Sequence, residues 1–298
     1  MYLEKRKTKQ YLVHSYRDND KVKKIRKYLG KNPSKEKIKK AKDQIQNTLK
    51  DINTKVFNFY LTKNQIKKLN NYETKIKINH LEKINWKRFT EEFTYNTNAI
   101  EGSTIQLNEV SKILKKKQTK NPEEIETKGV AKAIEFIRTT KEDLSVELIK
   151  KLHKLCFKNS KHFAGDLRKV EVVIKDAYGH IVHAGVPSKD INKNLRELIN
   201  FYKINKNNFK PLVLAAIIHN QFEHIHPFQD GNGRVGRLLL NFILLKNKYP
   251  PINIKLEDRK EYYISLQEYS KEDNLLPTMR FLIKQYKKTL KMSTKNKS

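Results

Sequence analysis

The sequence has a single cysteine, Cys156, among its 298 residues. An internal disulfide and a cysteine-based metal site are therefore both excluded. The apolar runs are far shorter than the roughly 20 residues that cross a membrane. The basic start of the chain also lacks the apolar stretch of a secretory signal. These absences favour a reducing compartment, and we expect a cytoplasmic protein without membrane contact.

Acidic residues are also scarce, with 32 Asp and Glu against 64 Lys and Arg, which gives a formal net charge of +32. Such an excess usually indicates nucleic acid or another anionic surface as a partner. Here the basic residues are mostly lysines, spread along the chain among many Asn and Ile, which also fits a biased genome composition. We therefore expect weak nonspecific nucleic-acid binding at low salt rather than a dedicated role.

One stretch of twelve residues stands out, from His226 to Arg237, reading His-Pro-Phe-Gln-Asp-Gly-Asn-Gly-Arg-Val-Gly-Arg. An apolar segment, Leu212–Ile218, precedes it, and apolar residues at helical spacing follow it. The order is therefore helix, polar loop, helix. Gly231 and Gly233 lie at the start of the second helix, where they allow backbone N–H groups to turn toward an anionic ligand.

The two arginines of this stretch occupy unfavourable positions. Arg234 and Arg237 fall near the start of the second helix, where the helix dipole disfavours cations. They also lie three residues apart on one face and repel each other. A bound anion would offset both costs, so the pattern predicts a polyphosphate site.

The residue types of the loop predict a chemistry. His226 is suited to act as a general base on a hydroxyl, and Asp230 is suited to bind Mg²⁺ with water and phosphate oxygens as its other ligands. Asn232 and the amides around the two glycines can hold a phosphate in the transition state. The set favours a transferase in which a hydroxyl attacks a nucleotide phosphate without a covalent enzyme intermediate.

The stretch resembles the signature of the Fic (Fido) family at each functional position. That resemblance implies an AMP transferase that uses ATP and Mg²⁺ to modify a Ser, Thr or Tyr hydroxyl of a protein. It implies that His226 is the base and that Phe228 anchors the loop in the core. It further implies that Asp230 binds Mg²⁺, that Asn232 and Arg234 bind phosphates, and that Arg237 binds the γ-phosphate.

A second segment, Thr97-Asn98-Ala99-Ile100-Glu101-Gly102, ends a predicted helix that begins near Trp86. Gly102 is a natural helix stop, and Glu101 lies in the last turn, where the dipole disfavours a negative charge. The segment is similar to the inhibitory motif of Fic proteins that carry it on an N-terminal helix. The resemblance implies that Glu101, with Thr97 and Gly102 in the motif, pairs with Arg237 and displaces the γ-phosphate.

Three further features bear on the site. Residues Phe163–Ala184 are β-prone around a turn at Asp176–Gly179 and resemble the family's flap, which would hold a target segment by strand addition. A purely structural hairpin is the alternative.

Of Tyr262 and Tyr263, one would stack on an adenine, with a packing role equally favoured. His219 and Glu223, one turn apart, are expected to support the loop.

The N-terminal part carries no recognisable chemistry. Gln10–Tyr16 and Lys21–Leu29 favour two strands around a turn at Asp18–Asp20. Pro33-Ser34 opens a helix, and a second helical region spans Lys63–Leu81. The first helix has an apolar stripe of Ile38, Ala41, Ile45, Leu49, Ile52 and Val56. We expect a basic region over 1–85, a Fic-like catalytic domain over 86–285 and a frayed basic tail over 286–298.

The sequence thus predicts a mainly α protein with a Fic-type helical core, a β-hairpin flap and a short N-terminal β ribbon. The function it favours is an autoinhibited protein adenylyltransferase that uses ATP and Mg²⁺, with an unknown protein substrate and with self-modification. A homodimer is one open arrangement. Three alternatives stay open: a hydrolase that removes AMP at the same site, transfer of another phosphate-containing group, and a basic nucleic-acid-binding protein with a vestigial site.

Overall fold

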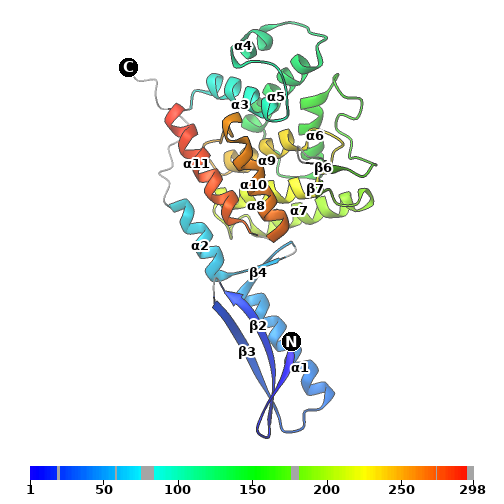
Figure 1. Ribbon diagram of the computed structural model, residues 1–298, viewed down its shortest axis with the longest axis vertical. Coiled ribbons are helices and arrows are strands. Elements are labelled where there is room, and N and C mark those ends of the chain that lie inside the picture. Colours follow the sequence, from blue (N-terminus) through cyan, green and yellow to red (C-terminus); the bar gives the residue numbers. More distant parts are fainter. Residues whose placement is uncertain (19–20, 58, 75–83, 176–180, 273, 294–298) are drawn as a thin grey trace. The chain divides into compact units, whose positions relative to one another are not determined.

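The computed structural model describes residues 1–18, 21–57, 59–74, 84–175, 181–272 and 274–293 (Figure 1). Within them lie eleven α-helices and seven short strands, so the predicted mainly α fold is confirmed. Tertiary contacts divide the chain into two compact units, Met1–Asn71 and Tyr72–Ser298. The predicted division at residue 85 stays a prediction.

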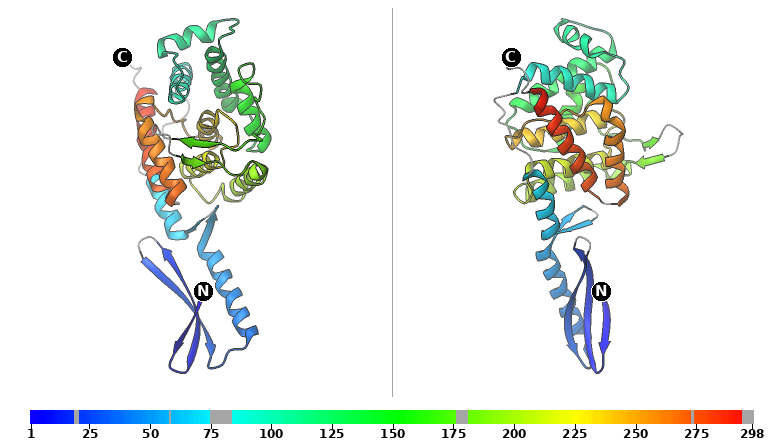
Figure 2. Two further views of the ribbon diagram at one scale, coloured as in Figure 1. Left: turned by 45° about the vertical axis from the view of Figure 1, so that its right-hand side comes forward. Right: turned by 60° about the vertical axis from the view of Figure 1, so that its left-hand side comes forward.

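The first unit is built on an antiparallel sheet in the order β1-β2-β3, formed by Tyr2–Arg6, Lys9–Asp18 and Lys21–Gly30. β2 and β3 are the predicted ribbon, and β1 is a third strand. The turn between β2 and β3 lies partly outside the described residues. Helix α1, Lys35–Ile52, lies along the sheet (Figure 2). Its apolar stripe packs against the sheet in a small core of Leu12, Leu29, Ala41 and Ile45.

The predicted extent of the α1 stripe was wrong at its end. The helix stops at Ile52, and Val56 belongs to β4, Asn53–Val56, which pairs with β5, Phe59–Thr62. Asn and Thr are weak helix formers, and Phe57 takes a left-handed φ of 53°, which turns the chain back. Helix α2 spans Lys63–Thr74, and the rest of the predicted Lys63–Leu81 region lies outside the described residues.

The second unit surrounds helix α8, Pro211–Ile225, in which most side chains are buried. Helix α9, Asn232–Lys246, follows after the signature loop and packs against α8. The chain folds this way because each helix contains a run that is apolar on nearly every face, Leu212–Ile218 in α8 and Leu238–Leu245 with one Asn in α9, as a central helix requires. The other helices of the unit are α3 (Trp86–Ile100), α4 (Leu107–Lys115), α5 (Pro122–Thr139), α6 (Val146–Phe157), α7 (Ile191–Asn205), α10 (Arg259–Glu272) and α11 (Leu276–Ser293).

The predicted hairpin is present as β6, Val173–Lys175, and β7, Ile181–Ala184, which pair antiparallel. It projects from the helices of the second unit (Figure 2). The strands are shorter than predicted, because the pairing begins at Val173 rather than Val170. The turn predicted at Asp176–Gly179 lies outside the described residues.

The frayed tail predicted from residue 286 onward was wrong over most of its length. α11 continues to Ser293, and Tyr286 is only 1% exposed. Met279, Leu282 and Tyr286 share one helix face, and burying that face holds the basic segment in place. The last five residues lie outside the described part of the chain.

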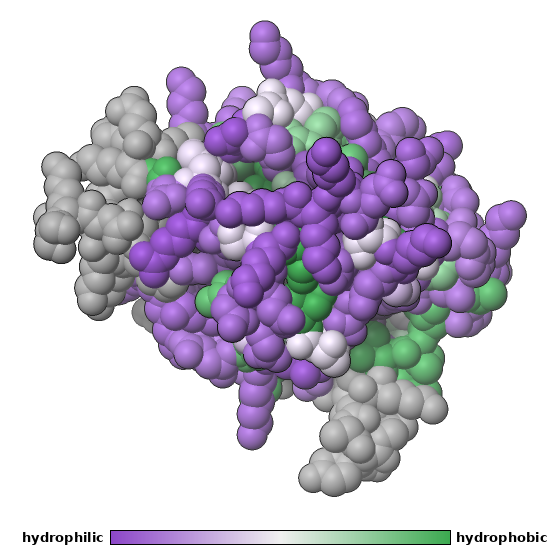
Figure 3. All heavy atoms as spheres, turned by 90° about the horizontal axis from the view of Figure 1, so that it is seen from above, coloured by the Kyte–Doolittle hydropathy of each residue, from purple (hydrophilic) through white to green (hydrophobic). Residues whose placement is uncertain are grey.

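The surface of the second unit seen from the α4 side is mostly hydrophilic (Figure 3). This agrees with the many lysines of the sequence and with its mean hydropathy of −0.78. Among the described residues, no helix combines the length and the apolar character needed to cross a bilayer.

Candidate active site

The signature loop begins at a strained residue. His226 is the C-cap of α8 and takes a left-handed conformation, with φ 52° and ψ 60°. Arg168, whose side chain is fully buried, holds this turn: its Nε donates to the His226 carbonyl at 2.7 Å, and its backbone N–H donates to the Pro227 carbonyl at 3.0 Å. Sequence reasoning did not assign Arg168 a role. Such strain persists only where the surroundings enforce it, as they do here.

A side chain closes the loop from within. The amide of Asn232 accepts from the Phe228 N–H and donates to the Phe228 carbonyl, both at 2.8 Å. Asn232 is only 2% exposed, so its side chain shapes the loop, and its predicted contact with a phosphate stays a prediction. Gly231 has φ 82°, and a Cβ on it would lie 2.3 Å from the Phe157 ring, which explains the glycine.

His153 on α6 packs against the signature loop, and the sequence did not predict this role. Its ring stacks on the fully buried Phe228 at a centroid distance of 3.9 Å. The Gly165 N–H donates to Nδ1 at 2.8 Å, so Nε2 carries the proton and donates to the Asp230 carbonyl at 3.0 Å. No sequence motif marks His153, because its partners lie 12 and 77 residues away.

Buried histidines make the fold sensitive to acid. Burial lowers the pKa of His153, His219 and His226 to about 4. In the unfolded chain their pKa is near 6.5, so the unfolded state binds more protons between pH 6.5 and 4. The free energy of unfolding therefore decreases as the pH falls through this window. The decrease reaches about 3 kcal/mol per histidine once the pH is below the folded pKa.

Glu223 opposes this trend, because burial raises the pKa of its carboxyl to about 8. The folded state then binds more protons than the unfolded state from pH 8 down to 4.5, and stability rises as the pH falls. We expect the free energy of unfolding, measured in urea, to decrease from pH 6.5 to 4.5, and to decrease more steeply in Glu223→Gln. Equal values across this range in both proteins would contradict the assignment.

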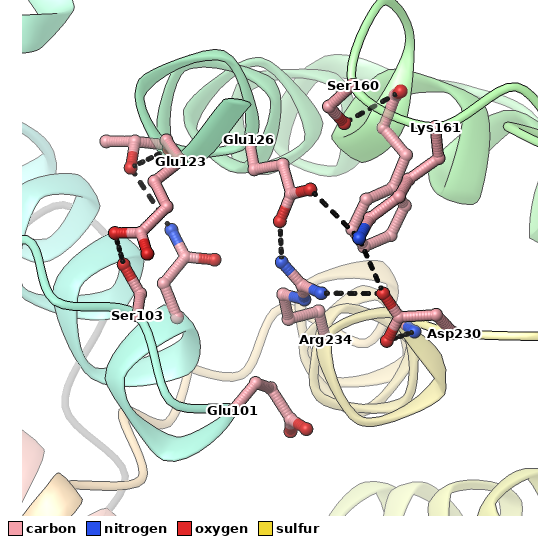
Figure 4. Close-up of polar contacts among 12 residues, drawn as sticks. Glu101, Ser103, Glu123, Glu126, Ser160, Lys161, Asp230 and Arg234 are labelled. Atoms are coloured by element: carbon pink, nitrogen blue, oxygen red, sulfur yellow. Dashed lines mark hydrogen bonds and ion pairs between the residues drawn. The ribbon is translucent and has the colours of Figure 1, made fainter. Parts of the chain in front are cut away.

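Both signature arginines are paired with carboxylates from other helices, and Arg234 is paired with Glu126 of α5 (Figure 4). Lys161 Nζ lies 3.7 Å from Glu126 and 3.1 Å from the Asp230 carboxylate, which is also 3.7 Å from Arg234. Burial alone would raise the pKa of Asp230, but the charge of Arg234 and the contacts with Lys161 lower it, so Asp230 is ionised. Sequence reasoning did not predict Glu126 or Lys161 here.

Arg237 is 1% exposed and is held by the segment that resembles the inhibitory motif. Its Nε donates to the Thr97 hydroxyl at 2.7 Å, and its Nη2 donates to the Thr97 carbonyl at 2.9 Å and to Glu101 Oε1 at 2.7 Å. The pairing of Glu101 with Arg237, implied by resemblance, is therefore present. Charge-assisted hydrogen bonds of this kind are among the strongest in proteins.

Glu101 also covers the start of α9. A Cβ on Gly233 would lie 2.3 Å from Glu101 Oε1, so the carboxylate lies against the first turn of α9, where a helix favours an anion. The backbone after Glu101 is fixed, because Gly102 turns with φ 95° and Glu123 accepts from Ser103 Oγ and the Thr104 N–H at 2.9 and 3.0 Å. The protein thus presents its own carboxylate at the predicted anion site.

The tautomer of His226 follows from the hydrogen bond that its ring makes. Nδ1 lies 3.3 Å from the Glu223 carbonyl, which only accepts, so Nδ1 carries the proton and Nε2 is the basic nitrogen. Because burial lowers its pKa to about 4, the imidazole is neutral at physiological pH. The side chain is therefore in the form that a general base requires.

A cavity of about 440 Å³ brings most of these groups together. It is lined by Glu101, His226, Gly233 and Arg237, by Ile174 and His183 of the flap, and by Tyr262 and Tyr263. Asp230, Asn232 and Arg234 do not line it. Tyr262 is 1% exposed, and its hydroxyl hydrogen bonds His219 at 2.9 Å, so its ring is not free to stack on a base. Tyr263 is the remaining candidate.

A profile of the Fic/DOC family matches residues 143–244, which include the signature loop and helices α6 to α9. The chain carries a Fic/DOC family domain. It is 29% identical over 207 residues to the protein adenylyltransferase Fic of Nematostella vectensis, which covers 66% of this chain and 47% of that protein. It is also 29% identical over 203 residues to protein adenylyltransferase fic-1 of Caenorhabditis elegans, covering 64% and 39%. The chain thus spans about half, or less, of these curated relatives.

Solved structures agree on the fold of the Fic domain. A Fic-domain protein of Bacteroides thetaiotaomicron superimposes with a TM-score of 0.66 at 24% identity, covering 77% of this chain and 95% of that one. Fic-1 of Caenorhabditis elegans superimposes with a TM-score of 0.61 at 22% identity, covering 86% and 75%. The predicted Fic-type helical core is therefore confirmed.

Proposed function

We propose that this chain is a protein adenylyltransferase that is held inactive by its own Glu101. One observation carries the proposal. A single cavity is lined by the imidazole of His226 and by the start of α9 at Gly233. In this cavity the Glu101 carboxylate lies against Gly233 and accepts a hydrogen bond from Arg237, where a phosphate is expected to bind. A site built for phosphates and a neutral imidazole suit the transfer of a nucleotide phosphate to a hydroxyl. The naming of the curated relatives as adenylyltransferases supports the same reaction.

ATP fits this arrangement. The N–H groups at the start of α9 suit its phosphates, and Arg237 suits the terminal phosphate once Glu101 has moved. Tyr263 lines the cavity and offers a ring to the adenine. Arg234, paired with Glu126, packs over the Phe157 ring at 4.3 Å and fixes the helix start on which the phosphates would rest.

Mg²⁺ also fits the residues present. The Asp230 carboxylate is 46% exposed and already faces a cation, Lys161 Nζ, at 3.1 Å. Mg²⁺ is usually bound by one or two carboxylates together with phosphate oxygens and water, so Asp230 with a nucleotide suffices. When bound, the ion would neutralise charge that builds on the phosphates. Lys161 would then give up its contact with Asp230.

The chain's own residues supply the rest of the mechanism. His226 Nε2 takes the proton from the attacking hydroxyl, while the Glu223 carbonyl and Arg168 hold the imidazole and its backbone in place. The bond formed joins the substrate oxygen to the α-phosphorus, and the bond broken releases pyrophosphate. The flap presents Val173, Ile174 and Ile181, which are 47%, 38% and 62% exposed, to a substrate strand. A cytoplasmic location and a homodimer remain predictions.

The position of the radioactive label in ATP tests this reaction. Compared with the same lysate and Mg²⁺ without the protein, we expect Glu101→Gly to attach additional label to protein from α-³²P ATP and no additional label from γ-³²P ATP. AMP transfer retains the α-phosphorus and releases the other two phosphates. Mass spectrometry should find a mass gain of AMP on a hydroxyl, including on the chain itself. Label from the γ-phosphate would indicate transfer of a phosphoryl group instead, and removal of AMP from an already modified protein would indicate the reverse reaction.

A further inference from the structure

The first unit carries a surface that the proposed reaction does not use. α1 covers one face of the β1-β2-β3 sheet through Ala41 and Ile45, which pack on Leu12 and Leu29. Side chains alternate between the two faces of a strand, so the residues between these core positions lie on the opposite face, away from α1. From the cross-strand register, this outer sheet face presents Tyr2 and Arg6 of β1, Tyr11 of β2, and Lys24, Arg26 and Tyr28 of β3, around Val13, which is fully buried.

The outer sheet face is aromatic. Tyr2 and Tyr28 are 46% and 56% exposed, and no other aromatic side chain is as exposed among those that the structure describes. Tyr11 and Tyr28 are direct cross-strand partners, and their ring centroids lie 5.4 Å apart. Tyr2 and Tyr28 thus offer exposed rings on the two outer strands, and Tyr11 lies half-buried on the strand between them.

The same unit concentrates the positive charge of the chain. Residues 1–71 contain 21 Lys and Arg but only 6 Asp and Glu, so nearly half of the net charge of +32 lies in less than a quarter of the sequence. A uniform bias toward lysine does not produce this distribution. On the outer sheet face, Glu4 pairs with both Arg6 and Arg26, and Arg26 lies two residues before Tyr28 on the same face of β3.

We propose that the outer sheet face binds single-stranded nucleic acid. Unpaired bases stack on exposed aromatic rings, and the phosphates that join them require nearby cations; this face supplies both at the spacing of adjacent strands. In a duplex the base faces are already stacked on one another and cannot stack on the tyrosines, so single strands should bind more tightly. RNA and DNA share the phosphates and the base faces, and the chain would bind both. This site is separate from the Fic domain.

Fluorescence anisotropy of the full chain tests the proposal with three labelled probes: a 12-nucleotide oligouridylate, a 12-nucleotide oligothymidylate and a 12-base-pair duplex. We expect both single strands to bind more tightly than the duplex at 200 mM salt. Tyr28→Ala should weaken single-strand binding about tenfold, since one stacked base is lost. Tyr28→Phe keeps the ring and should bind like the unmodified chain.

Charge variants examine the second half of the site. Arg26→Ala should reduce the slope of log affinity against log salt by about 0.7, the value for one phosphate contact on a single strand. Glu4→Gln removes a carboxylate from the face and should tighten binding. Arg196→Ala is the matched control, because it removes an exposed arginine from α7 of the second unit and should leave both affinity and slope unchanged.

The outcomes distinguish a specific single-strand site from nonspecific electrostatic binding. Equal affinity for duplex and single strands would overturn the proposal, as would an unchanged affinity in Tyr28→Ala, since either result means attraction of phosphates alone. So would a loss in Arg196→Ala equal to that in Arg26→Ala. Circular dichroism of each variant checks that the sheet is intact. His226→Ala should not change binding, so the result is independent of the proposed transferase activity.

Discussion

Replacing His226 by alanine in the Glu101→Gly background should reduce AMP transfer by about 10²- to 10⁴-fold, the usual contribution of a positioned general base. The cavity then lacks a group that can accept the hydroxyl proton, while the nucleotide site around α9 is unchanged. We therefore expect ATP binding, measured by calorimetry, to be retained while the initial rate of labelling from α-³²P ATP falls. Retention of binding distinguishes a lost base from a collapsed site.

Two variants make this result interpretable. His226→Asn keeps a residue that tolerates the left-handed backbone and should be as inactive as His226→Ala, which excludes loop distortion as the cause. His162→Ala removes an exposed histidine outside the cavity and should label at the parental rate. If His226→Asn and His226→Ala both retain activity, the imidazole is not the base and the mechanism is wrong.

Glu101→Gly should raise the rate of labelling by about 10- to 100-fold over the unmodified chain. The basis is the pair of Glu101 with Arg237, whose Nη2 donates to the carboxylate at 2.7 Å. A hydrogen bond to a charged group contributes about 1.5–3 kcal/mol, and ATP must replace it to place its terminal phosphate. Without the carboxylate, ATP no longer has to displace this hydrogen bond in order to bind productively, and the start of α9 is uncovered.

The neighbouring changes define the cause. Glu101→Gln has a similar shape but no charge and should give an intermediate rate, because it still covers Gly233 but binds Arg237 weakly. Glu142→Gly is the matched control: Glu142 is a loop glutamate, 47% exposed, whose ion pair with Lys151 lies outside the cavity. It should label like the unmodified chain. If the rate of labelling does not increase in Glu101→Gly, the inhibitory role of Glu101 is wrong. The transferase proposal would then be tested only by comparing label from α-³²P ATP with label from γ-³²P ATP.

The parts of the site that the sequence predicted are those encoded by neighbouring residues. The helix–loop–helix order around His226 follows from local spacing, and the end of α3 at Ile100 follows from Gly102, which takes φ 95° just after the C-cap. The unfavourable position of Glu101 at the C-terminal end of α3 was visible in the sequence, and its pairing with Arg237 offsets that cost. The same argument does not hold for Arg237, which is the sixth residue of α9 and lies beyond the first turn.

The parts that the sequence did not predict depend on contacts between distant residues. Glu126 pairs with Arg234 across 108 positions, and nothing distinguishes it from other glutamates at the start of a helix. Arg168 reaches the His226 carbonyl across 58 positions. The stripe of α1 was extended too far for a related reason. Val56 fits the helical period, but its burial comes from β4 and not from a continued helix.

The location of Glu101 on the same polypeptide as Arg237 has a consequence for control. An inhibitor supplied in trans dissociates on dilution, whereas a tethered group acts at an effective concentration set by the chain itself. Under the proposed inhibition, the ratio of closed to open molecules of a monomeric chain is then the same at any expression level. Under the proposed inhibition, activation requires Glu101 to leave Arg237, and the bonds of Ser103 and Thr104 with Glu123 hold the backbone next to it.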